Sequence, residues 1–240
     1  MKRILIALAV LLSVQVADAQ TKTPEVAKKA VEAADAAAQN PKKATKVATW
    51  LKLATSYMDA YNAPKGAAWV GASKQELQLV MGSEKPTASE TVTLGGDTCV
   101  KEVYADKNLY FGANGQLAII EVTQPVYPNS LQKALEAYVK ANEVDPKQTK
   151  LKDITTGLET IANKYLNEAF NSYQFGDLAG ASKLFEKAAE AAAGRDTQFA
   201  DVTANHWAAG YVATGTSATA SNFINGYSET SFGPEDNVTY

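Results

Sequence analysis

The chain has 240 residues, of which 23 are Lys or Arg and 26 are Asp or Glu, and its formal net charge is −3. This length suffices for one helical solenoid or two small domains, and the mild negative charge without a basic block argues against a nucleic-acid partner. Cys99 is the single cysteine, so an internal disulfide framework is excluded, and we expect Cys99 to be a buried strand residue rather than a reactive thiol.

The first residues have the parts of a secretory signal peptide. Lys2 and Arg3 precede the apolar run 4–16, and the small-residue ending Ala-Asp-Ala follows at 17–19. The apolar run is shorter than the ~20 residues that a membrane-spanning helix needs. We therefore predict a signal peptide at residues 1–19, export across the inner membrane into the periplasm, and no transmembrane segment after cleavage.

Residues 20–48 are rich in alanine and have a helical spacing of small residues. Pro24 suits a first helical turn, and the Asn40-Pro41 pair ends the helix. One predicted face of this helix is made of Val26, Ala30, Ala33 and Ala37. Such a small face favours close packing on a neighbouring helix, and an exposed surface helix is the alternative.

The next helix has an aromatic and apolar face with a small residue within it. Trp50, Leu53 and Tyr57 share the face, and Ala54 allows a partner helix to approach closely. The partner pattern of alanines and one aromatic does not follow at once but appears at residues 134–146. We therefore expect the two helices to pair across an insertion.

That insertion, at about residues 62–128, has α and β signals of its own. Ser73 and Glu76 have the spacing of a capping box, which predicts a short helix. Asn114-Gly115 is the strongest hairpin signal of the chain. Four short strands are predicted, at residues 91–94, 98–104, 109–111 and 116–122. Together they should form a small antiparallel meander that packs against the helices.

A long helix is predicted from Leu151 to Gln174, followed by a Gly176-Asp177 turn and a second helix. Residues 202–227 repeat the same spacing of small and aromatic residues. The last predicted helix would expose an apolar patch made of Phe223, Ile224, Tyr227 and Phe232. We therefore expect either a C-terminally truncated chain or a homodimer through this exposed C-terminal repeat.

These spacings resemble those of the tetratricopeptide-repeat (TPR) family, in particular its exported bacterial members. The resemblance is carried by W-x2-L-A-x2-Y at residues 50–57, by residues 134–146, by the Gly176 turn with Ala169 and Ala181, and by residues 208–220. The fold class that this implies is mainly α: a TPR-type helix–turn–helix solenoid over residues 20–240 with the small antiparallel β insertion inside one repeat.

The resemblance implies a non-enzymatic scaffold of the bacterial cell envelope, whose concave groove binds a peptide segment or a partner protein. The residues that would line this groove are Leu51, Thr55, Met58, Asn163, Leu166, Phe170, Tyr173, Asn205 and His206. Phe170 and Tyr173 are the strongest candidates because aromatic residues carry interface energy, and packing between repeats is the alternative for both.

The sequence also bears on two other classes of function. Trp69, Tyr104, Tyr110 and Phe111 of the insertion could form an aromatic platform that binds a glycan or another small molecule, or they could form the core of the sheet. An enzyme is disfavoured because His206 is the only histidine, and because Ser130 and Lys133, although spaced as in serine acyltransferases, lack the companion motifs. We predict no catalytic residue, no cofactor and no metal site.

Overall fold

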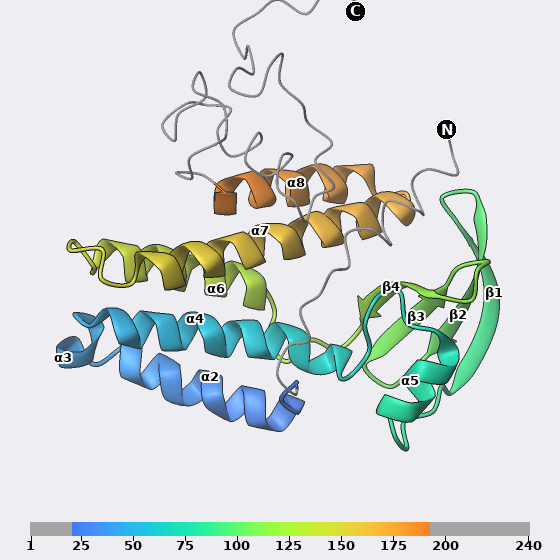
Figure 1. The fold of residues 1–240 in the computed structure, drawn as a ribbon, viewed down its shortest axis with the longest axis horizontal. Helices are drawn as coiled ribbons and strands as arrows, with labels where there is room; N and C mark the ends of the chain where they lie inside the picture. Colours follow the sequence, from blue (N-terminus) through green and yellow to red (C-terminus); the bar gives the residue numbers. More distant parts are fainter. Residues whose placement is uncertain (1–20, 193–240) are drawn as a thin grey trace, which may run out of the picture. The chain divides into compact units, whose positions relative to one another are not determined.

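The structure is a computed structural model that describes residues 21–192 (Figure 1). The chain divides into two compact units, with the division between Ile154 and Thr155. The first unit contains most of the described helices and all of the described strands. The second contains most of one long helix and the helix that follows it.

The helical part of the first unit is built around α4 (Val47–Asn62). This helix packs against α2 (Pro24–Ala38) on one side and, more extensively, against α6 (Ser130–Glu143) on the other (Figure 1). The contacts are close because fully buried alanines lie where the helices meet: Ala27, Ala54, Ala134 and Ala141. The predicted pairing of residues 50–57 with residues 134–146 is therefore present.

The face of α2 was predicted one position out of register. Its buried residues are Ala27, Val31 and Ala34, whereas Val26 is half exposed. Alanine occupies so many positions of this helix that apolar periodicity does not single out one face. The ends of the helix follow the prediction, since Pro24 lies in the first turn after the Thr23 cap.

A short helix, α3 (Pro41–Ala44), joins α2 to α4. The Asn40 side chain caps it by accepting a hydrogen bond from the Lys42 amide at 3.0 Å. Trp50 of α4 donates from its indole Nε1 to the Ala44 carbonyl at 2.7 Å. The turn is thereby attached to the helix that follows it.

Between α4 and α6 the chain forms a four-stranded antiparallel meander in the order β1-β2-β3-β4, as the sequence predicted. The strands are β1 (Ala88–Leu94), β2 (Asp97–Val103), β3 (Lys107–Phe111) and β4 (Leu117–Val122). A 3-10 turn, η1 (Ala63–Lys65), and the helix α5 (Lys74–Val80) precede them. The Ser73–Glu76 capping box that begins α5 is present as predicted.

The sheet has a hydrophobic core of its own. Leu77 of α5 and Ala72 are buried together with Leu109, Phe111 and Leu117 of the strands, so α5 covers one face of the sheet. The Asn114-Gly115 turn joins β3 to β4, and Gly115 has a φ of +76°, a conformation that glycine adopts without strain. Cys99 of β2 is buried, as predicted.

The second unit contains α7 (Leu151–Gln174) from Thr155 onward, together with α8 (Leu178–Ala192). The predicted turn separates the two helices: Gly176 has a φ of +81°, and the Asp177 carboxylate accepts a hydrogen bond from the Gly180 amide at 2.8 Å. The rings of Phe170 and Phe185 meet edge to face with their centroids 5.4 Å apart.

The predicted fold class is wrong. The described residues form a mixed arrangement of helices and a four-stranded sheet, and no TPR solenoid is present among them. Small residues that are buried at the crossing, together with an aromatic residue packed beside them, are common wherever two helices pack closely. Their spacing therefore indicates local helix packing and does not identify this family. The central helix, α4, lies between two neighbours, and the chain continues through η1 and α5 into a sheet with its own core.

Candidate functional site

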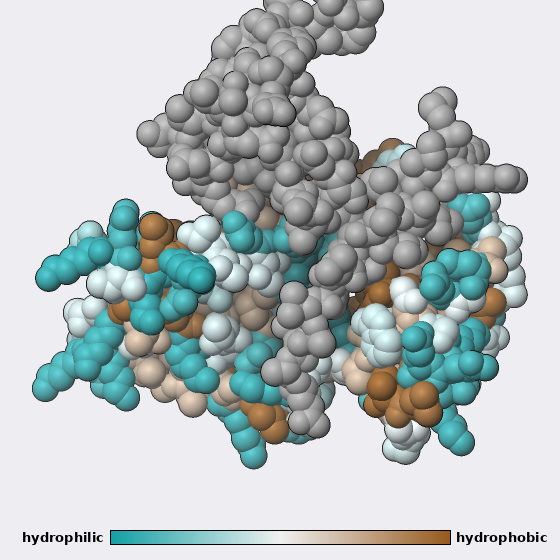
Figure 2. All heavy atoms as spheres, viewed as in Figure 1, coloured by the Kyte–Doolittle hydropathy of each residue, from teal (hydrophilic) through white to brown (hydrophobic). Residues whose placement is uncertain are grey.

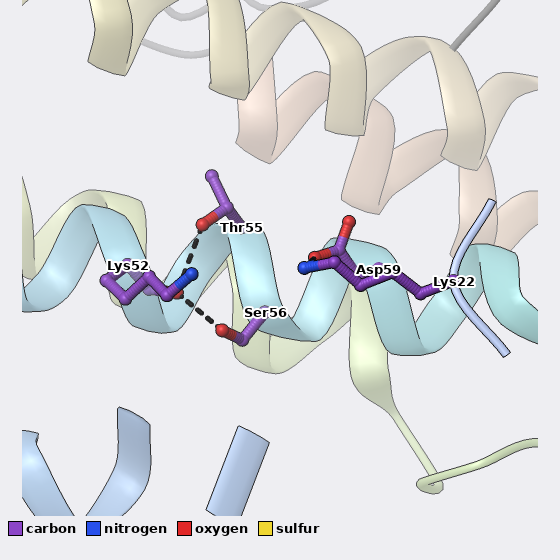
Figure 3. A network of polar contacts seen from close by, with 5 residues as sticks. All are labelled: Lys22, Lys52, Thr55, Ser56 and Asp59. Carbon is purple, nitrogen blue, oxygen red and sulfur yellow. Dashed lines mark hydrogen bonds and ion pairs between the residues drawn. The ribbon is translucent and has the colours of Figure 1, made fainter. Parts of the chain in front are cut away.

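The three predicted groove residues on α4 differ in their exposure to solvent. Met58 is buried, Leu51 is partly exposed and Thr55 is exposed. The Thr55 hydroxyl donates to the carbonyl of Lys52 at 3.1 Å, and the Ser56 hydroxyl donates to the same oxygen at 2.8 Å (Figure 3). The exposed hydroxyl of this group is thus already engaged with the backbone of its own helix.

The predicted residues on α7 belong to the second unit. Leu166 is buried, Asn163 is partly exposed, and Phe170 packs on Phe185 of α8. Tyr173 is 45% exposed, so it is the α7 candidate most accessible to a partner. Asn205 and His206 lie outside the described residues. Binding by these side chains stays a prediction.

The four aromatic residues of the predicted glycan platform do not share a surface. Phe111 is buried in the core beneath α5, and Trp69 and Tyr104 are partly buried against that core. Tyr110, the neighbour of Phe111 in β3, points to the other face of the sheet and donates its hydroxyl to Glu121 at 2.7 Å. These aromatics stabilise the sheet, which was the alternative assignment.

A polar cluster joins residues of α2, α4 and α6 in the first unit. The Tyr57 hydroxyl donates to the Asp35 carboxylate at 2.8 Å, and the Lys133 ammonium lies 3.4 Å from the same hydroxyl. The Tyr127 ring meets the Tyr57 ring edge to face. Burial, followed by the hydrogen bond to Asp35, raises the pKa of Tyr57, so this group is a neutral donor rather than a base.

Lys107 is the most deeply buried charged side chain of the described residues, with 1% of its surface exposed. Its ammonium group lies 2.9 Å from Glu84 and 3.0 Å from Asp106, and 5.7 Å from the centre of the Tyr104 ring. Glu84 precedes β1, whereas Asp106 precedes β3. The lysine therefore connects two loops at one end of the sheet, and no local pattern of residues indicates this role.

These arrangements contain no recognisable catalytic constellation among the described residues. The Ser130 hydroxyl donates to the Tyr127 carbonyl at 2.8 Å, and Lys133, its spacing partner, is directed to Tyr57. Asp59 of α4 is paired with Lys22 at 2.5 Å (Figure 3). Across residues 21–192, no group of His, Cys, Asp and Glu side chains has the arrangement of a metal site.

The comparisons with known proteins give a match in a different region of the chain, outside residues 21–192. Residues 198–240 match the S-layer homology domain. No curated protein and no solved structure matches the chain. S-layer homology domains anchor proteins to the cell surface by binding cell-wall polymers.

This match corrects the resemblance drawn from the sequence. The third TPR-like unit, at residues 202–227, falls inside the S-layer homology match, and no TPR family is found. Asn205 and His206, assigned to a peptide groove, also fall inside it. The assignment to the TPR family is therefore wrong.

The S-layer homology match supports a less specific location and a less specific partner than the sequence predicted. Proteins with S-layer homology domains are secreted or reside at the cell surface, and the partner of the domain is a cell-wall polymer. Periplasmic residence, a peptide partner and a homodimer have no support from the comparisons. Within residues 21–192, no helix has the combination of length and apolar character that a membrane crossing requires.

Proposed function

We propose that this is a non-enzymatic protein of the cell envelope, in which residues 198–240 bind a cell-wall polymer and hold residues 21–192 at the cell surface. The observation that supports the proposal is the S-layer homology match. The predicted signal peptide is in accord with it, since a protein must be exported before it can bind the wall. The helices and the sheet of residues 21–192 then form the part that the anchor displays.

Co-sedimentation with purified cell walls tests the proposal. The mature chain is mixed with intact walls and with walls from which the accessory polymers have been chemically extracted, so that only peptidoglycan is left. We expect the protein to sediment with the intact walls and to stay in solution with the extracted ones. Sedimentation with neither preparation would contradict the proposal, whereas equal sedimentation with both would identify peptidoglycan, rather than an accessory polymer, as the bound polymer.

A pair of aromatic substitutions shows which region binds. Trp207→Ala changes a large side chain inside the matched residues, and Tyr173→Ala changes an exposed one on α7. We expect Trp207→Ala to reduce sedimentation with intact walls and Tyr173→Ala to leave it unchanged. The opposite result would move the binding site to α7, and both variants should be compared by circular dichroism to confirm that they fold.

A further inference from the structure

Lysines gather at one end of the helical part of the first unit. The segment between α2 and α4 reaches this end, and so does the loop that follows α6, because α4 and α6 run in opposite directions (Figure 1). Figure 2 shows hydrophilic side chains along this end. We name it the lysine end and define it by Lys42, Lys43, Lys46, Lys140, Lys147, Lys150 and Lys152, all of which are exposed.

Most of these lysines are not neutralised by a neighbouring acid. Lys140 is paired with Glu143 at 2.6 Å, and Lys150 is paired with Asp153 at 3.2 Å. The other five have no ion-pair partner among residues 21–192. This end is thus positively charged, although the whole chain has a net charge of −3.

The one acid that could offset the loop lysines from within the loop is turned inward. Asp145 is buried, and its carboxylate accepts hydrogen bonds from the Thr149 hydroxyl at 2.8 Å and from the Lys150 amide at 2.7 Å. Burial opposes the charged form, but these hydrogen bonds outweigh it and lower the pKa of Asp145. The loop therefore presents lysines to solvent and keeps its carboxylate inside.

The backbone that carries the lysines is fixed in place. The α3 turn is held by the Asn40 cap and by the Trp50 indole, and the loop after α6 is held by Asp145. Charges mounted on an ordered backbone bind a partner with a smaller loss of conformational entropy than charges on a flexible tail. The ammonium groups themselves remain exposed and hydrated, as binding to a polymer at the surface requires.

We propose that the lysine end binds an anionic polymer of the cell wall and forms a second contact in addition to that of residues 198–240. This inference rests on the proposed function. A polymer with a phosphate in each repeat unit supplies acceptors for several lysines at once, and lysine binds phosphate as a compact point charge. Each exposed ion pair is weak alone, but the anchor holds the lysines near the polymer at a high effective concentration.

Binding of soluble polyglycerol phosphate to the mature chain tests this inference, with neutral dextran of similar length as the negative probe. The patch variant carries Lys42→Gln, Lys43→Gln, Lys46→Gln and Lys147→Gln. The control variant carries Lys28→Gln, Lys29→Gln, Lys85→Gln and Lys183→Gln. The control lysines are also exposed and have no ion-pair partner among the described residues, so both variants change the net charge equally.

We expect the patch variant to bind polyglycerol phosphate about tenfold more weakly, because four weak ion pairs are lost together, and the control variant to lose less than about threefold. The difference should disappear at about 1 M salt, where charges are screened within about 3 Å. Equal weakening in both variants would overturn the inference, because net charge alone would then explain binding. Absence of binding by the parent chain would overturn it as well.

Two further measurements distinguish the wall polymer from a lipid surface and the lysine end from the anchor. Binding to phosphatidylglycerol vesicles with the same lysine dependence, and no binding to polyglycerol phosphate, would replace the wall polymer by a lipid surface and overturn the inference. In the Trp207→Ala background, the lysine end should still bind soluble polyglycerol phosphate even where wall sedimentation is lost. If instead the patch variant binds both cell walls and polyglycerol phosphate as tightly as the parent chain does, the inference fails while the proposed function stands.

Discussion

Lys107 occupies a position that few lysines adopt in folded proteins, because its ammonium group is removed from bulk water. Glu84 and Asp106 compensate the charge from two different loops, and both carboxylates keep contact with solvent. If Lys107 is replaced, water can therefore hydrate both carboxylates. If the carboxylates are removed instead, the buried ammonium group is left with neither a charged partner nor water. The arrangement fixes the loop before β1 against the turn before β3.

Replacement of Lys107 separates the packing of its aliphatic stem from its charge. We expect Lys107→Ala to reduce the free energy of unfolding by about 2–4 kcal/mol, since it leaves a cavity beside the sheet. Lys107→Met retains the volume and should reduce it by less than about 2 kcal/mol, since both acids can be hydrated. Urea denaturation followed by circular dichroism measures both values.

Lys101 provides the matched control for these substitutions. It lies on the neighbouring strand β2 and pairs with Glu90 at 3.0 Å, but it is partly exposed. Lys101→Met should therefore change the free energy of unfolding by no more than about 1 kcal/mol. An equal effect of Lys101→Met and Lys107→Ala would contradict a special role for the buried position.

At the scale of elements, the contact between α4 and α6 depends on small side chains at the crossing. Ala54 and Ala134 are completely buried, which leaves no space for a longer side chain between the helices. Overpacking of a filled core forces side chains from their preferred rotamers and shifts the backbone. The same residues that resembled a family signature therefore have a direct structural role.

Ala134→Leu tests this contact. We expect it to reduce the free energy of unfolding by about 1–3 kcal/mol, because the added atoms must displace α4. Val139→Leu on the same helix is the control, since Val139 is half exposed and the change should stay within about 0.5 kcal/mol. Thermal melts of both variants suffice. A stabilised Ala134→Leu protein would show that the crossing contains unfilled space.

Local signals in the sequence predicted most individual elements. The capping box at Ser73, the Asn114-Gly115 turn and the Gly176 turn each act within a few residues, so they could be recognised without knowledge of the fold. The family assignment failed because small-residue spacing is shared by many helix pairs. One contrary signal was present: residues 215–221 are rich in Thr, Ser and Gly, which disfavour a third helical repeat.

The sites were much less predictable than the elements. Two strands, β1 and β2, separate Lys107 from Glu84 in the sequence. The lysine end likewise joins Lys42 and Lys43 to Lys147, which lies in a distant part of the sequence. A search of the sequence for runs of basic residues does not find this site, because neither lysine segment is such a run by itself. Such groupings depend on which helix ends coincide, and only the fold determines that.

At the scale of the whole molecule, buried tyrosines make the first unit sensitive to alkaline pH. Burial first, and then neighbouring acids, raise the pKa of Tyr57, Tyr110 and Tyr138, and raise the pKa of Tyr104 to about 12. The unfolded chain releases its tyrosine protons at about pH 10, while the folded chain retains them. The folded state then binds more protons, so the free energy of unfolding must fall as pH rises above this value.

Tyr57→Phe tests this dependence. Between about pH 9.5 and pH 11.5, the variant should lose stability less steeply than the parent chain, by up to about 1.4 kcal/mol per pH unit, because one titrating group is removed. Met58→Leu, at the next position of α4, removes no ionisable group and should shift the curve without changing its slope. Parallel curves for the parent chain and Tyr57→Phe would contradict the assignment.

The burial of Cys99 within β2 makes oxidation of this thiol depend on whether the chain is folded. Its sulfur lies 3.9 Å from the Asp97 carbonyl, and burial is the main cause that raises the pKa of the thiol, so the folded protein presents little reactive thiolate. An unfolded chain exposes the same sulfur, which then forms disulfides under oxidising conditions. Covalent dimers would then form only between chains that have not folded, and a disulfide-linked band would mark misfolded material rather than an assembly.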